Sequence, residues 1–301
     1  MSRSRPLGVS VIICTRNRSR SLARTLQAIS AVKLESVEDF ELLVVDNGST
    51  DATPSVVKEF ARTAPFCTGY VSEPRAGLSF ARNRGLASAS GDLIMFTDDD
   101  CLVASDWVQT ALEAFAGDFL KIVGGKVELF NKDHLPFPTN AAAVRETLAS
   151  AGQVLSGLVI GANMAFGRGV VDRIGLFDVR LGAGTSVHAA EDTDFVYRAL
   201  VSGISVTYEP SLVVYHDHGR TGARELIRLH RGYAMGGGAM MMKHLLRGRT
   251  DLIRPIYWDS RSAVRGWRTH PARWRSPLSK LGYVAGAIQF LIQESWRRSA
   301  D

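Results

Sequence analysis

Three consecutive aspartates, Asp98, Asp99 and Asp100, directly follow an apolar run at residues 93–96. Such a run is typical of a buried strand. Because side chains alternate along a strand, Asp98 and Asp100 should point the same way and Asp99 the opposite way. Carboxylates this close repel one another unless a positive charge lies among them. Since Mg²⁺ and Mn²⁺ prefer oxygen ligands, the run predicts a divalent metal site, with a solvated turn as the alternative.

Two further pairs of residues have side chains that could do chemistry. Glu191 and Asp192 stand at the start of a predicted helix, where the helix dipole keeps a carboxylate ionised and able to accept a proton. Taken alone, that pair favours helix capping. His216 and His218 follow a predicted strand at residues 212–215 and share a face if the strand continues, although surface histidines are the alternative.

These residues lie among alternating strands and helices. Strands are predicted at residues 9–14, 40–45, 70–71 and 93–96, and helices from about residue 21, after residue 51, at 77–90 and after residue 105. This order implies a mostly parallel sheet with right-handed crossovers, which binds ligands outside the carboxyl ends of its strands. Four polar loops should therefore converge on one crevice: residues 15–18, 46–49, 73–75 and 98–100.

The second half of the chain is less regular. Strands are predicted at residues 121–129, 159–166, 206–208 and 212–215, and helices at 141–155 and 191–200, with a short helix ending near 175. From Gly222 onward the pattern is helical. We expect Gly236, Gly237 and Gly238 to break that helix, and we expect no further strand.

The composition is that of an ordinary globular protein. The 301 residues are 46% apolar and 22% charged, which allows one large α/β domain or two smaller ones. The net charge is +6, and the excess of Arg and Lys gathers in residues 220–298, as in a surface for anionic lipid or an acidic acceptor, or in a solvated helical face. Three cysteines without CxxC spacing argue against a disulfide framework. We identify no signal peptide and no membrane-spanning stretch.

Five ordered motifs resemble those of the inverting glycosyltransferases of family two, which have the GT-A fold. They are VIICTRN at 11–17, VVDNGSTD at 44–51, GLSFARNRGL at 77–86, the acidic run as the DxD motif, and EDTDF at 191–195 as the ED motif. The resemblance covers roughly residues 9–218. It implies a GT-A (Rossmann-like) domain at 1–219, with a nucleotide-binding half at about 1–104 and an acceptor half at about 105–219. A basic helical region at 220–301 would follow.

The resemblance implies a metal site at the acidic run. Asp100 would be a direct ligand, Asp98 would contact the metal or the ribose, and Asp99 would contact the sugar or support the residues that bind the metal. His216 would be a further ligand, with His218 as the fallback, because imidazole suits Mn²⁺ better than Mg²⁺. An Asp/Asp/His set also fits a metal-dependent hydrolase, so the nucleotide loops must decide.

The resemblance also implies a nucleotide site in the first two loops. Thr15, Arg16 and Asn17 would line it, and Asp46 would accept a hydrogen bond from a uracil imide. Arg75 and Arg82 are cations near the expected crevice, and one of them would contact phosphate or base.

With these motifs upstream, Asp192 becomes the expected general base, and Glu191 would bind the acceptor or orient Asp192. Gly161 and Asn163 would line the pocket for the donor sugar and the acceptor. Trp107 could stack on a sugar ring, although a core tryptophan is the alternative.

Together these expectations describe a metal-dependent inverting glycosyltransferase that uses Mn²⁺ or Mg²⁺ and a nucleotide-sugar donor, with a UDP-sugar preferred. The acceptor would be a carbohydrate, a lipid-linked molecule or another hydroxyl compound, and no nucleic acid partner is expected. One alternative is a sugar-nucleotide-forming nucleotidyltransferase, against which the glycine-free loop at 15–18 argues. Another is a non-catalytic glycan- or membrane-binding protein, against which Asp100 and Asp192 argue.

The resemblance gives no role to the C-terminal region, residues 220–301. Its mixed basic and apolar residues fit contact with a membrane, packing on the catalytic domain or packing on a second subunit. We expect a cytoplasmic protein, with peripheral contact at the inner face of the membrane as one arrangement.

Overall fold

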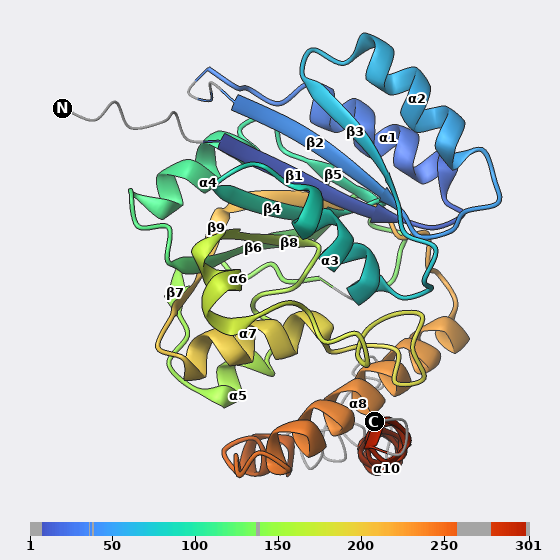
Figure 1. The fold of residues 1–301 in the computed structure, drawn as a ribbon, viewed down its shortest axis with the longest axis vertical. Helices are drawn as coiled ribbons and strands as arrows, with labels where there is room; N and C mark the ends of the chain where they lie inside the picture. The colour runs from blue at the N-terminus through green and yellow to red at the C-terminus, as the bar shows by residue number, and fades with distance from the viewer. Residues whose placement is uncertain (1–7, 36, 38, 137–138, 258–277, 299–301) are drawn as a thin grey trace.

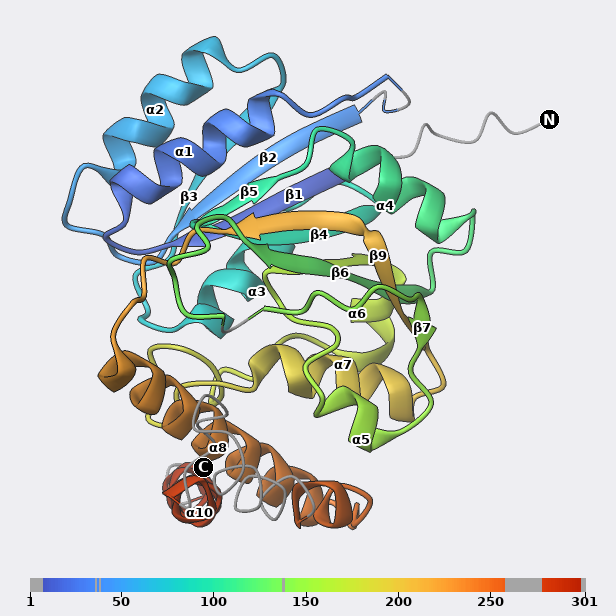
Figure 2. The ribbon, with the colours of Figure 1, turned by 180° about the vertical axis from the view of Figure 1, so that it is seen from behind.

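The computed structural model describes residues 8–35, 37, 39–136, 139–257 and 278–298, which form a nine-stranded sheet with helices on both faces (Figures 1 and 2). The strands are β1 (Gly8–Thr15), β2 (Asp39–Asp46), β3 (Cys67–Ser72), β4 (Leu93–Asp98), β5 (Cys101–Val103), β6 (Lys121–Leu129), β7 (Glu146–Thr147), β8 (Asn163–Gly167) and β9 (Ser205–His216). The helices are α1 (Ser19–Ser30), α2 (Thr53–Thr63), α3 (Leu78–Ser88), α4 (Trp107–Phe115), α5 (Ala151–Val154), α6 (Gly169–Ile174), α7 (Glu191–Val201), α8 (Ala223–Leu245) and α10 (Leu278–Arg298).

The strand order is β3-β2-β1-β4-β8-β6-β9-β5, with β7 paired to β9. Strands β1 to β4 are parallel, as the sequence predicts, whereas β8 runs antiparallel to both β4 and β6. Because parallel strands end at the same edge, Thr15 pairs with Asp46 and Cys14 with Asp98. This register places the loops after β1, β2 and β4 side by side, where ligands bind in such sheets.

Both faces of the sheet are buried, which explains why β1 is apolar except at Ser10 and at its last residue, Thr15. Val11 and Ile13 belong to the core under α1, α2 and α4, whereas Ile12 belongs to the core under α3, α6 and α7. The second core includes stacked rings of Phe177 and Phe195, with centroids 4.4 Å apart. That packing fixes α7, which carries Glu191 and Asp192, against the sheet.

Most strands and helices of the first half are confirmed, but the short strand β5 was not predicted. The helix predicted at residues 141–155 is wrong. Part of that segment is strand β7, which pairs with the free edge of β9, and Ser150 then caps the short helix α5 by accepting from Gln153 N. The strands predicted at 206–208 and 212–215 are one strand, β9, in register with β6 except for a shift at Gly125.

The prediction that three glycines break the C-terminal helix is also wrong. Helix α8 continues through Gly236, Gly237 and Gly238, because α10 crosses it there at close range (Figure 1). A Cβ atom at Gly238 would lie 1.9 Å from the carbonyl oxygen of Tyr283, and one at Gly286 would lie 1.9 Å from that of Met235. The glycines therefore permit close approach of two helices, which outweighs their weak helix propensity.

We expect Gly286→Ala to destabilise the protein by about 1–3 kcal/mol, because the added methyl must displace backbone of α8. Gly232→Ala is the matched control, since that position in α8 has its nearest neighbour at 3.4 Å and should gain about 0.5–1 kcal/mol from helix propensity. Thermal unfolding of both variants tests this. Shifts of the same sign would contradict the proposed packing.

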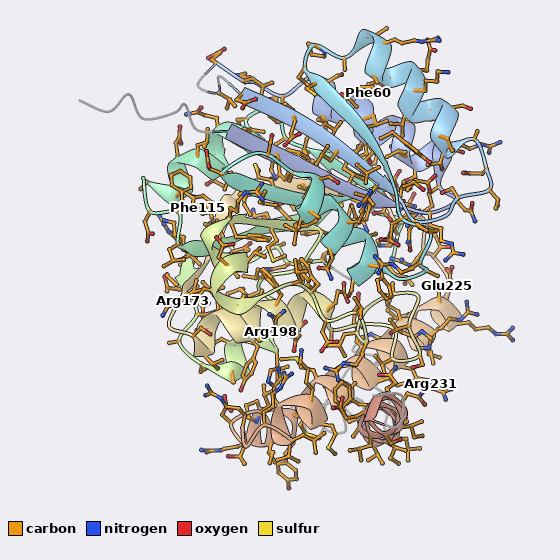
Figure 3. All side chains as sticks on the ribbon, viewed as in Figure 1. Phe60, Phe115, Arg173, Arg198, Glu225 and Arg231 are labelled. Carbon is orange, nitrogen blue, oxygen red and sulfur yellow. The ribbon has the colours of Figure 1, made fainter. Side chains whose placement is uncertain are left out.

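A buried charge network joins α7 to α8. The carboxylate of Asp194 accepts hydrogen bonds from Lys243 Nζ, His244 Nε2 and Arg198 Nε, each at 2.8 Å, and Lys243 Nζ also lies 2.8 Å from Asp178 Oδ2. Burial opposes ionisation of Asp194, but its hydrogen bond to His244 and the charge of Lys243 hold its pKa below its usual range. Removing one partner would leave a buried charge uncompensated, so the network holds α8 against α7, the helix that carries the ED motif. Arg198 is labelled in Figure 3.

Candidate active site

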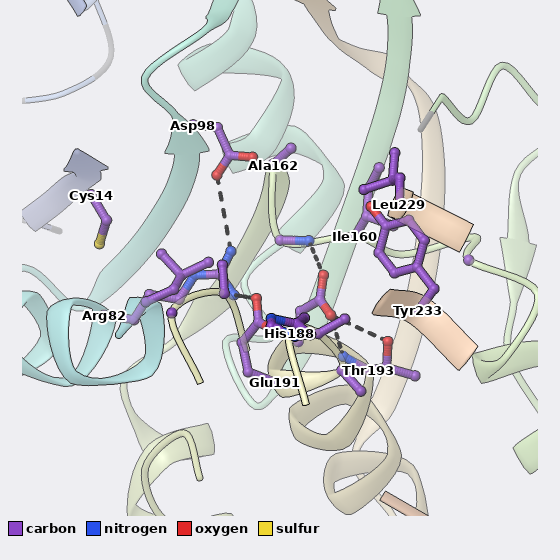
Figure 4. A pocket seen from close by; sticks show the side chains of 18 of the residues that line it. Cys14, Arg82, Asp98, Ile160, Ala162, His188, Glu191, Thr193, Leu229 and Tyr233 are labelled. Carbon is purple, nitrogen blue, oxygen red and sulfur yellow. Dashed lines mark hydrogen bonds and ion pairs between the residues drawn. The ribbon is translucent and has the colours of Figure 1, made fainter. Parts of the chain in front are cut away.

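A cavity of about 580 Å³ opens at the carboxyl ends of the parallel strands (Figure 4). Most of the residues predicted to form the site line this cavity: Thr15, Arg16, Arg82, Asp98, Asp99, Asp100, Gly161, Glu191, Asp192 and His216. They come from β1, α3, β4, the segment before β8, α7 and β9. Thr15 and His216, 201 positions apart in the chain, therefore line the same cavity.

The acidic run turns sharply between β4 and β5, so its three side chains face different partners. Asp100 Oδ1 lies 3.0 Å from His216 Nε2, and Asp100 Oδ2 lies 2.6 Å from Arg18 Nη2. Asp99 Oδ2 accepts a hydrogen bond from Thr15 Oγ1 at 2.7 Å. Asp98 is the most exposed of the three, and Arg82 Nη2 lies 4.0 Å from its carboxylate.

The surroundings separate the pKa values of these carboxyl groups. Burial raises the pKa of Asp98, and burial together with the charge of Asp100 raises that of Asp99 to about 7. Burial also opposes ionisation of Asp100, but His216 and Arg18 outweigh it and lower its pKa. Asp100 is thus held as a carboxylate, the form that binds a metal.

Asp98, Asp100, His216 and Cys101 each place a possible ligand atom within 4.8 Å of the others. Two carboxylates and one imidazole are a donor set that suits Mn²⁺, and the three residues are those expected from the sequence. Cys101 was not expected there. Its burial raises the pKa of the thiol well above its usual value, and a hard divalent cation prefers the oxygen and nitrogen ligands.

The two histidines differ in what their ring nitrogens contact. His218 Nε2 lies 3.0 Å from the carbonyl oxygen of Leu135, and its Nδ1 accepts a hydrogen bond from the backbone N–H of Arg220 at 2.9 Å. Both nitrogens of His218 are therefore engaged by backbone. His216 belongs to the ligand cluster, which favours it over the fallback.

Arg82 links the DxD motif to the ED motif. Its side chain is only 3% exposed, and Nη1 donates to Glu191 Oε1 at 2.8 Å while Nη2 approaches Asp98 (Figure 4). A Cβ atom at Gly161 would lie 2.2 Å from Nη2, so glycine is needed at that position. Burial and the charge of Asp192 raise the pKa of Glu191 to about 7 against the opposing charge of Arg82.

Asp192 stands in the first turn of α7 with its carboxylate oriented by backbone. Gly161 N donates to Oδ2 at 2.8 Å, and Thr193 N donates to Oδ1 at 2.7 Å. His188 and Ala190 precede it with positive φ values of 64° and 78°, which cost free energy for residues other than glycine. A Cβ atom at Gly236 of α8 would lie 2.7 Å from the backbone of Ala189, so α8 packs directly on this strained segment.

Three residues predicted to bind the nucleotide are not among those that line the cavity. Asn17 Oδ1 accepts from Thr50 N at 2.7 Å and so ties the first loop to the second. Asp46 accepts from Ser49 N at 2.8 Å and from Tyr70 Oη at 2.7 Å. Arg75 is largely exposed and forms an ion pair with Glu73. Their nucleotide contacts stay predictions.

Trp107 and Asn163, predicted to lie at the sugar, are in the core instead. The indole N–H of Trp107 donates to Asn163 Oδ1 at 2.9 Å, and both side chains are almost fully buried. Asn163 Nδ2 donates to the carbonyl oxygens of Lys126 and Leu212 at 2.9 and 2.8 Å. The pair satisfies backbone groups between β6, β8 and β9, which leaves no free ring face for stacking.

Several lining residues were not singled out from the sequence. Arg18 pairs with Asp100, and Asn47 shapes the loop after β3 by donating to the carbonyl oxygens of Glu73 and Arg75. Arg220 lines the cavity with a buried Nη1 atom that has no hydrogen-bond partner among the described residues. Tyr233 of α8 closes the opposite wall beside Leu229 (Figure 4). Arg18 lies in a loop that the strand order had already marked, whereas no pattern in the sequence points to Arg220.

Comparisons with known proteins agree with the geometry. Glycosyltransferase AglE of Haloferax volcanii is 26% identical over 214 residues, which are 69% of this chain and 66% of AglE. The chain matches a smaller share of several other curated relatives.

Two solved structures confirm the predicted α/β GT-A fold. The mannosyltransferase PcManGT from Pyrobaculum calidifontis, solved with GDP-Man and Mn²⁺, has a TM-score of 0.65 and 19% identity, covering 96% of this chain and 88% of its own. TarS 1–349 from S. aureus, solved with UDP-GlcNAc, has a TM-score of 0.57 and 17% identity, covering 97% of this chain and 92% of its own.

The model of the family described as glycosyl transferase family 2 matches residues 10–175. The match spans more than half of the chain and includes the first four of the five motifs. The chain therefore belongs to glycosyl transferase family 2.

Proposed function

We propose that this protein transfers a sugar from a nucleotide-diphosphate sugar, preferably a UDP-sugar, to a hydroxyl acceptor with inversion at the anomeric carbon. The observation that carries the proposal is the shared cavity. A cluster suited to a divalent cation, Asp98, Asp100 and His216, and an oriented carboxylate, Asp192, line the same space, linked through Arg82 and Glu191.

Asp192 would act as the general base in a single displacement. The acceptor oxygen forms a bond to the anomeric carbon, its proton passes to Asp192, and the bond from that carbon to the diphosphate breaks. The electron pair leaves with the diphosphate, so no covalent intermediate with the protein is needed. The N–H of Gly161 and the N–H and hydroxyl of Thr193 hold the carboxylate. Thr193 donates twice to Oδ1, whereas Oδ2 accepts from Gly161 N and keeps a lone pair for the proton.

A divalent metal held by Asp98, Asp100 and His216 would supply positive charge for the leaving diphosphate. Arg18 already supplies a cation at Asp100, and Arg220 brings a second one to the cavity. Both arginines are placed for a polyanionic leaving group, since guanidinium binds phosphate oxygens through paired N–H donors.

The unpaired Arg220 nitrogen yields a specific expectation. Arg220→Gln should raise the donor KM about 10- to 100-fold, because a charge-assisted hydrogen bond to phosphate contributes about 1.5–3 kcal/mol. Arg224→Gln is the matched control, an exposed arginine of α8 outside the cavity lining. Steady-state kinetics measures the donor KM of both variants, and equal values would show that Arg220 does not bind the donor.

The donor class can be tested before the acceptor is known. Thermal unfolding of wild type and Asp100→Ala would be measured with UDP, GDP, dTDP and CMP, each with and without Mn²⁺. A nucleotide at 100 times its dissociation constant should stabilise the wild type by about 2.7 kcal/mol. Stabilisation by UDP that requires Mn²⁺ and is lost in Asp100→Ala supports the proposal.

Stabilisation by a different nucleotide would keep the mechanism and change the donor, which matters because the solved relatives hold GDP-Man in one case and UDP-GlcNAc in another. Absence of any shift would overturn the proposed function.

A further inference from the structure

The outer face of α10 is apolar where a helix on a water-facing surface is normally polar. Its exposed aliphatic side chains are between 41% and 66% exposed, and we call them the α10 stripe: Leu281, Val284, Ile288, Leu291 and Ile292. Their spacing places them along one side of the helix. Among residues 281–295 the single charged side chain is Glu294, which is turned inward to Arg180.

The inward face of α10 is made of small residues and one large ring. Gly282 and Gly286 pack on the backbone of α8, and Phe290 packs in a cluster with Leu181, Val187 and Ala239. The helix thus uses its glycines for packing within the protein and directs its large aliphatic side chains outward. Transfer of the α10 stripe from water into an apolar environment would lower the free energy, because apolar side chains would leave contact with water.

Exposed arginines lie around the same end of the molecule. Arg231 of α8 lies beside the start of α10, because its carbonyl oxygen would be 3.5 Å from a Cβ at Gly282, and the labelled side chain extends beside α10 in Figure 3. Arg247, Arg249 and Arg254 follow α8 and are exposed. The exposed apolar residues Leu246, Ile253 and Tyr257 alternate with them.

Between residues 220 and 257 the chain has seven arginines, against one glutamate and one aspartate. Arg220 lines the cavity, and the other six arginines are exposed. In Figures 1 and 2, α10 and the carboxyl end of α8 form the end of the molecule opposite α1 and α2. An apolar stripe with cationic neighbours is complementary to an anionic bilayer surface, whose headgroups attract arginine while the acyl boundary accepts aliphatic side chains. In a second copy of this chain the arginines would meet like charge instead.

We propose that the α10 stripe and its neighbouring arginines dock the protein on a bilayer that contains anionic lipid. None of the described helices has both the length and the hydropathy to cross a membrane, so docking would be peripheral. Resting on the proposed function, docking would also present the active site to acceptors in the bilayer. Tyr283 of α10 and Leu229 and Tyr233 of α8 line the cavity, so the docking helices also form its apolar wall.

The test is sedimentation of the full chain with vesicles of phosphatidylcholine, alone or mixed with phosphatidylglycerol. We expect sedimentation with the mixed vesicles, weakened by high salt, and a loss of at least about tenfold in partitioning for the double variant Val284→Glu with Ile288→Glu. Val144→Glu with Leu176→Glu is the matched control, because these side chains are 75% and 51% exposed, against 58% and 53% for Val284 and Ile288, and lie outside α8 and α10.

Three results would overturn docking: wild type that stays in the supernatant, equal partitioning of both double variants, or a wild-type dimer in solution that Val284→Glu with Ile288→Glu dissociates. The last result would assign the α10 stripe to a second copy of the chain. Nucleotide-induced thermal stabilisation, measured on the same samples, should be unchanged in the stripe variant. A failure of docking is thereby distinguished from a failure of the proposed transferase function.

Discussion

Replacing Asp192 by asparagine is expected to lower kcat by about 10²- to 10⁴-fold, the range that a general base contributes, with little change in the donor KM. Asparagine cannot take a proton from the acceptor hydroxyl. It does keep a carbonyl oxygen for the N–H of Gly161, which lies 2.8 Å from the aspartate, so the loop before β8 should stay in place. Steady-state kinetics with the donor nucleotide identified by thermal unfolding would measure the effect.

The control for this variant is Asp172→Asn. Asp172 also lies in the first turn of a helix, α6, but it is exposed and does not line the cavity. If the carboxylate of Asp192 served only the helix dipole, both variants would lose comparable stability and neither would lose turnover. A small loss of kcat in Asp192→Asn would thus mean that Asp192 stabilises the start of the helix and is not the general base.

Asp100→Ala is expected to lower turnover by about 10³-fold, because several kcal/mol of stabilisation for the leaving diphosphate would be lost with the metal. Chelation of wild type should have the same effect, and added Mn²⁺ should restore only the wild type. Asp100→Asn keeps the side-chain volume beside Arg18 and His216, so it separates loss of the metal from loss of packing.

Cys101→Ala provides the contrast within the same cluster. Its thiol lies among the possible ligands, but burial keeps it protonated, so its removal should leave activation by Mn²⁺ unchanged. Activity titrated with Mn²⁺ would report both effects. If Cys101→Ala instead shifts the metal dependence, the site is softer than two carboxylates and an imidazole, and a thiolate-binding metal becomes the better assignment.

The sequence predicted the parallel half of the sheet and the place of the site. Strands β1, β2 and β4 are apolar runs that end in polar residues, and burial of both sheet faces makes such runs recognisable. Since parallel strands end at one edge, Thr15 and Asp98 had to lie near each other. The family resemblance added Asp192 and His216, which line the same cavity.

The sequence was less informative where a residue's partners are far along the chain. Residues 141–155 have a helical pattern, but part of this segment pairs with β9 instead. The backbone groups at the free edge of β9 form hydrogen bonds with the short strand β7. Asn163 and Trp107 resembled site residues by position, yet they satisfy buried backbone groups and each other. Gly236, Gly237 and Gly238 resembled a helix break, but Gly236 packs on Ala189, and Gly237 and Gly238 pack on Tyr283 of α10.

The sequence alone determined which residues could do chemistry: carboxylates after a buried strand, a second acidic pair opening a helix, and a basic C-terminal region. Those are local properties, set by residue type and spacing. Only the tertiary structure decided that Arg82 bridges the two acidic motifs and that the large aliphatic residues of α10 face outward. It also decided that Arg220 has a buried nitrogen at the cavity with no hydrogen-bond partner in the part of the chain that the structure describes. Burial and pairing depend on segments that meet only when the sheet and the helix pair are assembled, and no local pattern encodes them.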